Sequence, residues 1–184
     1  MIAKVAGENT PEHRRHYLLG LAYLKIDRTS QAIPEYQEAL KLDLQNSVYH
    51  ADLAYCYLRS QKMDLAQQEA RKAADLSHQN SLAYLVLGIV QAEAGDLDGA
   101  IDFYQQALSL AEDDPQVHWN LAQVYFRKDN KLMGAYHLAR YSRLNLEPDK
   151  SMEQFKHARE LAGKGSEMSL RIQKEIDEIQ QEGI

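Results

Sequence analysis

Apolar positions follow a helical rhythm along nearly the whole chain. In the first stretch, Tyr17, Leu18, Leu21 and Leu24 recur at steps of three and four residues, the spacing of one buried face of an amphipathic helix. The chain is therefore predicted to be all-α. We expect about ten helices, at 11–26, 30–42, 47–60, 63–76, 81–94, 97–110, 115–128, 131–145, 149–162 and 166–181.

The pattern also repeats along the chain with a fixed period. Leu19, Leu53, Leu87 and Leu121 stand 34 residues apart, and each is followed by Gly or Ala. A period of this length indicates small helix pairs that stack on their neighbours instead of surrounding one central core. The small residues let two helix backbones come close, because a larger side chain would overpack the contact. This organisation favours a binding scaffold over an enzyme.

Helix starts recur with the same period. Asn46, Asn80 and Asp114 each precede a predicted helix, and each side chain can accept a hydrogen bond from a first-turn amide. The agreement between capping residues and apolar spacing supports the predicted boundaries.

Composition narrows the possible partners. The formal net charge is −6, which argues against a general affinity for nucleic acid, because such binding needs clustered Lys and Arg. No apolar run approaches the ~18 residues that would span a bilayer. The single cysteine, Cys56, lies in a helical apolar pattern, where a thiol acts as a small hydrophobe. We find no zinc-protease motif, phosphate loop or nucleophile with a base, and expect no catalytic, cofactor or metal site.

The repeated residues resemble those of the tetratricopeptide repeat (TPR) family. The first repeat reads Leu19-Gly20-Leu21-Ala22-Tyr23 and then Ala32, Tyr36 and Ala39, which matches both helices of a TPR unit. The third repeat keeps Leu87-Gly88, Ala100, Tyr104 and Ala107. This similarity covers about 11–145. It implies a right-handed α-solenoid of antiparallel helix pairs that acts as a non-catalytic protein–protein interaction scaffold.

The C-terminal part follows the repeat in a shifted register. Leu138-Ala139, Phe155 and Ala158 repeat the first unit after 119 residues, which is three and a half periods. The helix at 131–145 is thus predicted to be the second helix of one pair and the first helix of the next. We expect a flexible segment at 1–10, a TPR array of about four and a half repeats at 11–162, and a capping helix at 163–184. This ending resembles the C-terminal TPR domains of bacterial BepA-like zinc metalloproteases.

Three histidines occupy one repeat position. His16, His50 and His118 stand where the third repeat has Tyr84, at a position that should face the partner helix. We interpret them as structural. His13 and His16 could approach one metal ion from the same helix, but no third ligand is evident nearby.

The TPR resemblance implies a concave wall built from the first helices. At the corresponding positions this chain is unusually apolar, and large apolar patches tend to mark partner sites. The predicted ligand is a peptide or helix of another protein. The predicted groove residues are Tyr17, Leu21, Leu24, Tyr55, Leu58, Leu85, Ile89, Trp119, Asn120, Gln123, Phe126 and Arg127.

Two alternatives stay open at this point. The groove could be covered by the last helix of the chain, by a second copy or by a missing domain of a longer protein. The chain could also be the accessory, substrate-recruiting domain of a BepA-like periplasmic metalloprotease. The compartment would then be periplasmic, whereas cytoplasmic is the default expectation. Membrane insertion is not expected.

Overall fold

The computed structural model describes residues 10–181, which form ten helices. Every predicted helix is confirmed, and each end lies within one residue of the expected position. All of the predicted N-terminal segment except Thr10 lies outside the described residues. The helices are α1 (Glu12–Lys25), α2 (Thr29–Leu42), α3 (Ser47–Arg59), α4 (Met63–Leu76), α5 (Ser81–Glu93), α6 (Leu97–Leu110), α7 (Pro115–Arg127), α8 (Lys131–Leu144), α9 (Pro148–Ala162) and α10 (Glu167–Gln181).

The predicted capping residues act as expected. The side chains of Asn46, Asn80 and Asp114 each accept a hydrogen bond from a backbone N–H two or three residues further on. Asn130 does the same for α8, although sequence inspection did not single it out. These bonds satisfy donors that have no partner within the helix and so fix where it begins.

The chain divides into two compact units, and the N-terminal unit, Met1–Asp96, holds α1 to α5. Here α1 pairs with α2, α3 pairs with α4, and α5 packs against both α3 and α4. The close approach of α1 and α2 requires a small residue. A Cβ added to Gly20 would lie 2.8 Å from the ring of Tyr36, which is fully buried.

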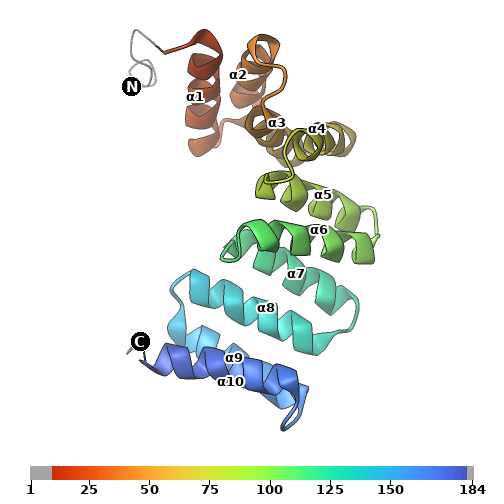
Figure 1. Cartoon of the computed structure of the whole chain (residues 1–184), viewed down its shortest axis with the longest axis vertical. Helices are drawn as coiled ribbons and strands as arrows, with labels where there is room; N and C mark the ends of the chain where they lie inside the picture. The colour runs from red at the N-terminus through yellow and green to blue at the C-terminus, as the bar shows by residue number, and fades with distance from the viewer. Residues whose placement is uncertain (1–9, 182–184) are drawn as a thin grey trace. The chain divides into compact units, whose positions relative to one another are not determined.

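The C-terminal unit, Leu97–Ile184, holds α6 to α10. Its helices follow one another as packed neighbours, and α8 lies against both α7 and α9 to a similar extent (Figure 1). Thus α8 belongs to two helix pairs, as the shifted register predicts. An apolar cluster joins α8, α9 and α10 through Tyr136, Phe155, Ile172, Ile176 and Ile179.

Candidate functional site

In the N-terminal unit, much of the predicted groove lining is covered by the chain itself. Leu85 is only 2% exposed. Tyr17 stacks on Tyr49 with ring centroids 4.5 Å apart. The remaining predicted groove residues of this unit are half-buried: Leu21, Leu24, Tyr55, Leu58 and Ile89. This unit therefore offers little free apolar surface at those positions.

In the C-terminal unit, by contrast, two large aromatic side chains on α7 reach solvent. Trp119 is 42% exposed and Phe126 is 41% exposed. Gln123 and Arg127 are also exposed, while Asn120 is half-buried. The Asn120 amide donates a hydrogen bond of 2.8 Å to the backbone carbonyl of Gln116, so part of its bonding capacity is already used.

Each exposed aromatic residue borders a hollow. The smaller hollow, of about 330 Å³, is lined by Pro115, Gln116, Trp119, Tyr141 and Asn145. The larger hollow, of about 590 Å³, is lined by Phe126, Lys131, Ala135, Leu138, Lys150, Glu153, Gln154 and His157. Both volumes can take a large apolar side chain.

The two hollows lie along the same faces of α7 and α8. On α7, the lining positions 116, 119 and 126 belong to one helical stripe that also includes 123. On α8, positions 131, 135, 138, 141 and 145 form another single stripe. We call this surface the α7–α8 face; its central residues are Trp119, Gln123, Phe126, Leu138 and Tyr141.

Packing fixes both aromatic side chains on the α7–α8 face. The ring centroids of Trp119 and Tyr141 lie 5.1 Å apart. The ring of Phe126 lies over Gly134, where an added Cβ would come within 2.5 Å of it. The aromatic groups are thus held in place and exposed together, which lowers the entropy that binding would cost.

The histidine position faces the partner helix, as predicted. In each case the bonded side chain lies 19 residues later, on the second helix of the pair. Nδ1 of His16 bonds Glu35 at 2.7 Å, and Nδ1 of His50 bonds Glu69 at 2.6 Å. Nδ1 of His118 meets Nδ1 of His137 at 3.0 Å. This spacing of 19 residues was present in the sequence, and it would have identified the partners.

The same repeat position carries different charge states in the two units. Both ring nitrogens of His50 bond acceptors, the Glu69 carboxylate and the Leu44 carbonyl, so both donate and the ring is charged. The hydrogen bond to Glu69 raises the pKa of His50. Burial lowers the pKa of His118. Burial lowers the pKa of His137 to about 3, together with the repulsion that a protonated His118 would exert.

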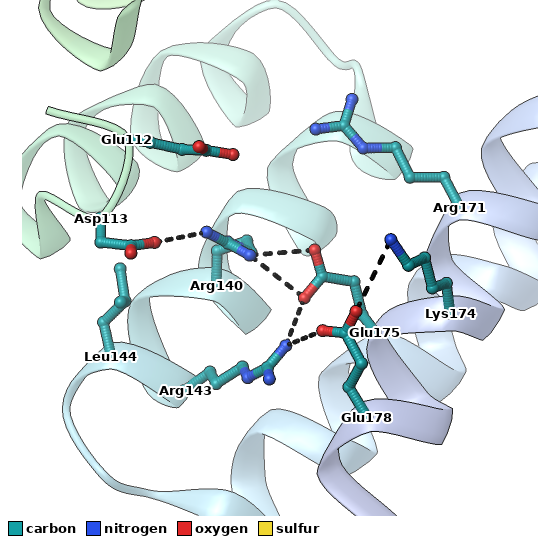
Figure 2. A pocket seen from close by; sticks show the side chains of 9 residues that line it. All are labelled: Glu112, Asp113, Arg140, Arg143, Leu144, Arg171, Lys174, Glu175 and Glu178. Carbon is teal, nitrogen blue, oxygen red and sulfur yellow. Dashed lines mark hydrogen bonds and ion pairs between the residues drawn. The ribbon is translucent and has the colours of Figure 1, made fainter. Parts of the chain in front are cut away.

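A third hollow, of about 520 Å³, is lined mainly by charged side chains of α8 and α10 and of the turn before α7 (Figure 2). Its centre is Glu175, whose carboxylate accepts hydrogen bonds from Arg140 at 3.0 Å and from Arg143 at 2.7 Å. Arg140 also bonds Asp113 at 2.8 Å. The lining holds four acidic and four basic side chains, so it favours neither anions nor cations. We assign it a structural role in holding α10.

Glu175 was not singled out in the sequence, although it lies on the buried side of the last helix. The structure buries it with Ile172, Ile176 and Ile179. The signal was present, because 172, 175, 176 and 179 follow the spacing of a single apolar stripe. A carboxylate in that stripe requires cationic partners, and α8 supplies them.

Other candidate chemistry has structural explanations. Cys56 is fully buried, and burial raises its pKa to about 12, so the thiol stays protonated. Within residues 10–181, no three His, Cys, Asp or Glu side chains are grouped to hold a metal ion. None of the described helices is long and apolar enough to cross a membrane.

Comparison with known proteins identifies similarity to proteins named as members of complexes. BBSome complex member BBS4 from Bos taurus is 30% identical over 102 residues, 55% of this chain and 20% of that protein. Anaphase-promoting complex subunit 3 from Schizosaccharomyces pombe is 27% identical over 129 residues, 70% of this chain and 19% of that protein. The chain thus spans about a fifth of the length of these relatives.

The fold is also similar to that of solved structures, one of which is a TPR domain. MamA 41-end from Desulfovibrio magneticus RS-1 superposes with a TM-score of 0.61 at 20% identity, covering 74% of this chain and 77% of that one. The Arabidopsis OM64 TPR domain superposes with a TM-score of 0.59 at 22% identity, covering 63% of this chain and 96% of that one. Residues 17–81 match the family profile described as tetratricopeptide repeat, and residues 90–129 match the profile described as TPR repeat. The chain therefore belongs to the tetratricopeptide repeat family of helical scaffolds for protein interaction.

Proposed function

We propose that the C-terminal unit binds an amphipathic helix of a partner protein along the α7–α8 face. The observation that carries this proposal is that two hollows, each beside an exposed aromatic residue, lie on one face of the same helix pair. Aromatic side chains of this kind are frequent energetic centres of protein interfaces. The interaction is non-catalytic.

The spacing of the two hollows favours a helical ligand. Trp119 and Phe126 are seven residues apart, which is two turns or about 10 Å along α7. A partner helix that presents apolar side chains at positions i and i+7 has the same spacing. Gln123 lies between the anchors and offers an amide for hydrogen bonding to the ligand.

The relatives support a role in assembly. Two of them are named as a member of one complex and a subunit of another. A scaffold that holds a helix of another subunit is consistent with both names. No contact within residues 10–181 favours the second function suggested by the sequence, an accessory domain of a BepA-like metalloprotease.

The proposal can be tested with a displayed library of amphipathic helices. The full chain serves as bait, and enriched peptides are labelled and titrated by fluorescence polarisation. We expect Trp119→Ala/Phe126→Ala to weaken binding at least ten-fold, because both anchors of the ligand lose their contacts.

The matched control is Leu161→Ala/Leu170→Ala, which removes exposed apolar side chains from α9 and α10 outside both hollows. It should bind as the wild type does. Circular dichroism spectra of both variants serve to check that they are folded. Equal affinity for the wild type and the aromatic variant, or an equal loss in both variants, would contradict the proposed site.

A further inference from the structure

We infer that the partner helix places an acidic N-terminal turn at the Phe126 hollow and runs antiparallel to α7. This inference rests on the proposed function and specifies the chemistry and direction of the ligand. Its basis is the difference in charge between the two ends of the α7–α8 face.

Two lysines, Lys131 and Lys150, line the Phe126 hollow together with His157, and Glu153 is the only acidic side chain of the lining. With His157 counted as neutral, the lining carries two positive charges and one negative charge, on a chain with a formal net charge of −6. Carboxylates of a ligand bound there would lie within a Debye length, about 8–10 Å, of both lysines.

The two lysines are held only by exposed ion pairs. Lys131 lies 3.8 Å from Asp129, and both side chains are more than two-thirds exposed. Lys150 lies 2.9 Å from Glu147, with side-chain exposures of 56% and 46%. Exposed pairs of this kind contribute little stability, so the lysines can exchange these partners for a carboxylate of the ligand.

A further polar group in the lining lacks a partner. The side-chain Oε1 of Gln154 is enclosed and accepts no hydrogen bond. A small rotation of the amide would let it accept one from an incoming N–H group. The first turn of a helix has N–H groups without internal partners, and it also favours acidic side chains. One element, an acidic helix N-terminus, therefore satisfies both the lysines and the amide.

The opposite end of the α7–α8 face has no such preference. The five residues that line the Trp119 hollow are all uncharged. Charge selection therefore acts at the Phe126 end alone. Because Trp119 lies near the start of α7 and Phe126 near its end, a helix that begins at Phe126 runs in the opposite direction to α7.

The first test uses the composition of the helices selected from the library. We expect Asp and Glu to be enriched in the turn that precedes the first apolar anchor. Binders with no charge preference there, or with Lys and Arg, would overturn the inference and leave the proposed function intact. A library without any binder would reject both.

The second test reverses the local charge. Lys131→Glu/Lys150→Glu should weaken binding of an acidic selected peptide at least ten-fold. The control Lys156→Glu/Lys164→Glu makes the same change in net charge at exposed positions outside the hollow, and it should stay within two-fold of the wild type. Equal losses in both variants would show that only the overall charge acts, and would contradict the local site.

The third test determines direction. Trp119 is the only tryptophan of the chain and lies at the end where we expect the ligand helix to finish. A tryptophan-free selected peptide carries a dansyl group at either its N-terminus or its C-terminus. Energy transfer from Trp119 should be stronger to the C-terminal label. Stronger transfer to the N-terminal label would overturn the antiparallel direction.

Discussion

His50 and His118 occupy the same repeat position but differ in charge, because the helix that faces them supplies different partners. His50 meets the carboxylate of Glu69, which keeps its ring protonated. His118 meets His137, and two protonated rings cannot share a contact of 3.0 Å between nitrogens. The carbonyl of Glu112 accepts from Nε2 of His118, so in the neutral pair Nδ1 of His118 accepts from His137.

The neutral pair makes the C-terminal unit sensitive to acid. The pKa of His137 is lowered to about 3, so between about pH 6.5 and 3 the unfolded chain binds more protons than the folded chain. The free energy of unfolding should therefore have its full value above pH 6.5. Below that pH it should fall by up to about 1.4 kcal/mol per pH unit for each proton. Urea unfolding followed by Trp119 fluorescence measures this slope.

The third repeat suggests the control variant for this prediction, because it has Tyr84 and Phe103 at the corresponding positions. His118→Tyr/His137→Phe should remove most of the slope between pH 4 and 6.5. If the variant loses stability in acid as steeply as the wild type does, the histidine pair is not its source.

Asp52 should have the opposite effect in the N-terminal unit. Burial raises its pKa to about 6, against a smaller opposing effect of the hydrogen bond from Tyr17. As pH rises, the unfolded chain loses this proton at a lower pH than the folded chain does. The free energy of unfolding therefore falls as pH rises from about 4 to 6. Asp52→Asn retains an acceptor for Tyr17 and should stabilise the chain at pH 7 by about 1–3 kcal/mol.

Thermal unfolding of the Asp52→Asn variant followed by circular dichroism, at pH 4 and at pH 7, tests this prediction. The gain should appear at pH 7 and nearly vanish at pH 4. A variant less stable than the wild type at pH 7 would show that the ionised carboxylate is a net stabilising group.

At the level of single helices, α10 is held against its neighbours by both apolar and ionic contacts. Its isoleucines join the cluster with α8 and α9, and Glu175 bonds Arg140 and Arg143 on α8. The side chain of Glu175 is only 12% exposed, so its removal would leave two arginines close together without their counter-charge. Glu178 bonds Arg143 as well but is 42% exposed.

Glu175→Gln should destabilise the C-terminal unit by about 2–4 kcal/mol, because breaking a buried ion pair leaves uncompensated charge. Glu178→Gln should cost less than about 1 kcal/mol, as exposed ion pairs do. Urea titrations of the two variants, read by Trp119 fluorescence, give both values. Equal losses would contradict the assigned role of Glu175.

At the scale of the whole molecule, the sequence determines the helices better than it determines the binding surface. Helix ends were predictable to within one residue because capping, turn and apolar signals coincide at each repeat. The exposure of the predicted groove was not predictable. Leu85 and Trp119 occupy the same repeat position, yet one is 2% exposed and the other 42%. The difference depends on neighbouring helices, which a repeat consensus does not specify.

The hollows of the C-terminal unit were beyond sequence inspection for a related reason. The Trp119 hollow combines residues of α7 with residues at the end of α8, and the Phe126 hollow adds residues of α9, which the register shift of α8 brings close. The sequence predicts the aromatic anchors Trp119 and Phe126, but it does not predict Lys131, Lys150 and Gln154. The role of these three residues depends on the packing of three consecutive helices, which the repeat pattern does not specify.

NMR mapping of a selected helical peptide on the isotope-labelled full chain tests where the partner binds. We expect the largest amide shift changes on titration in α7 and α8 and in the first half of α9, around both hollows. Changes concentrated in α1 to α5, or in α10 around Glu175, would show that the partner binds elsewhere and would contradict the assignment of the α7–α8 face.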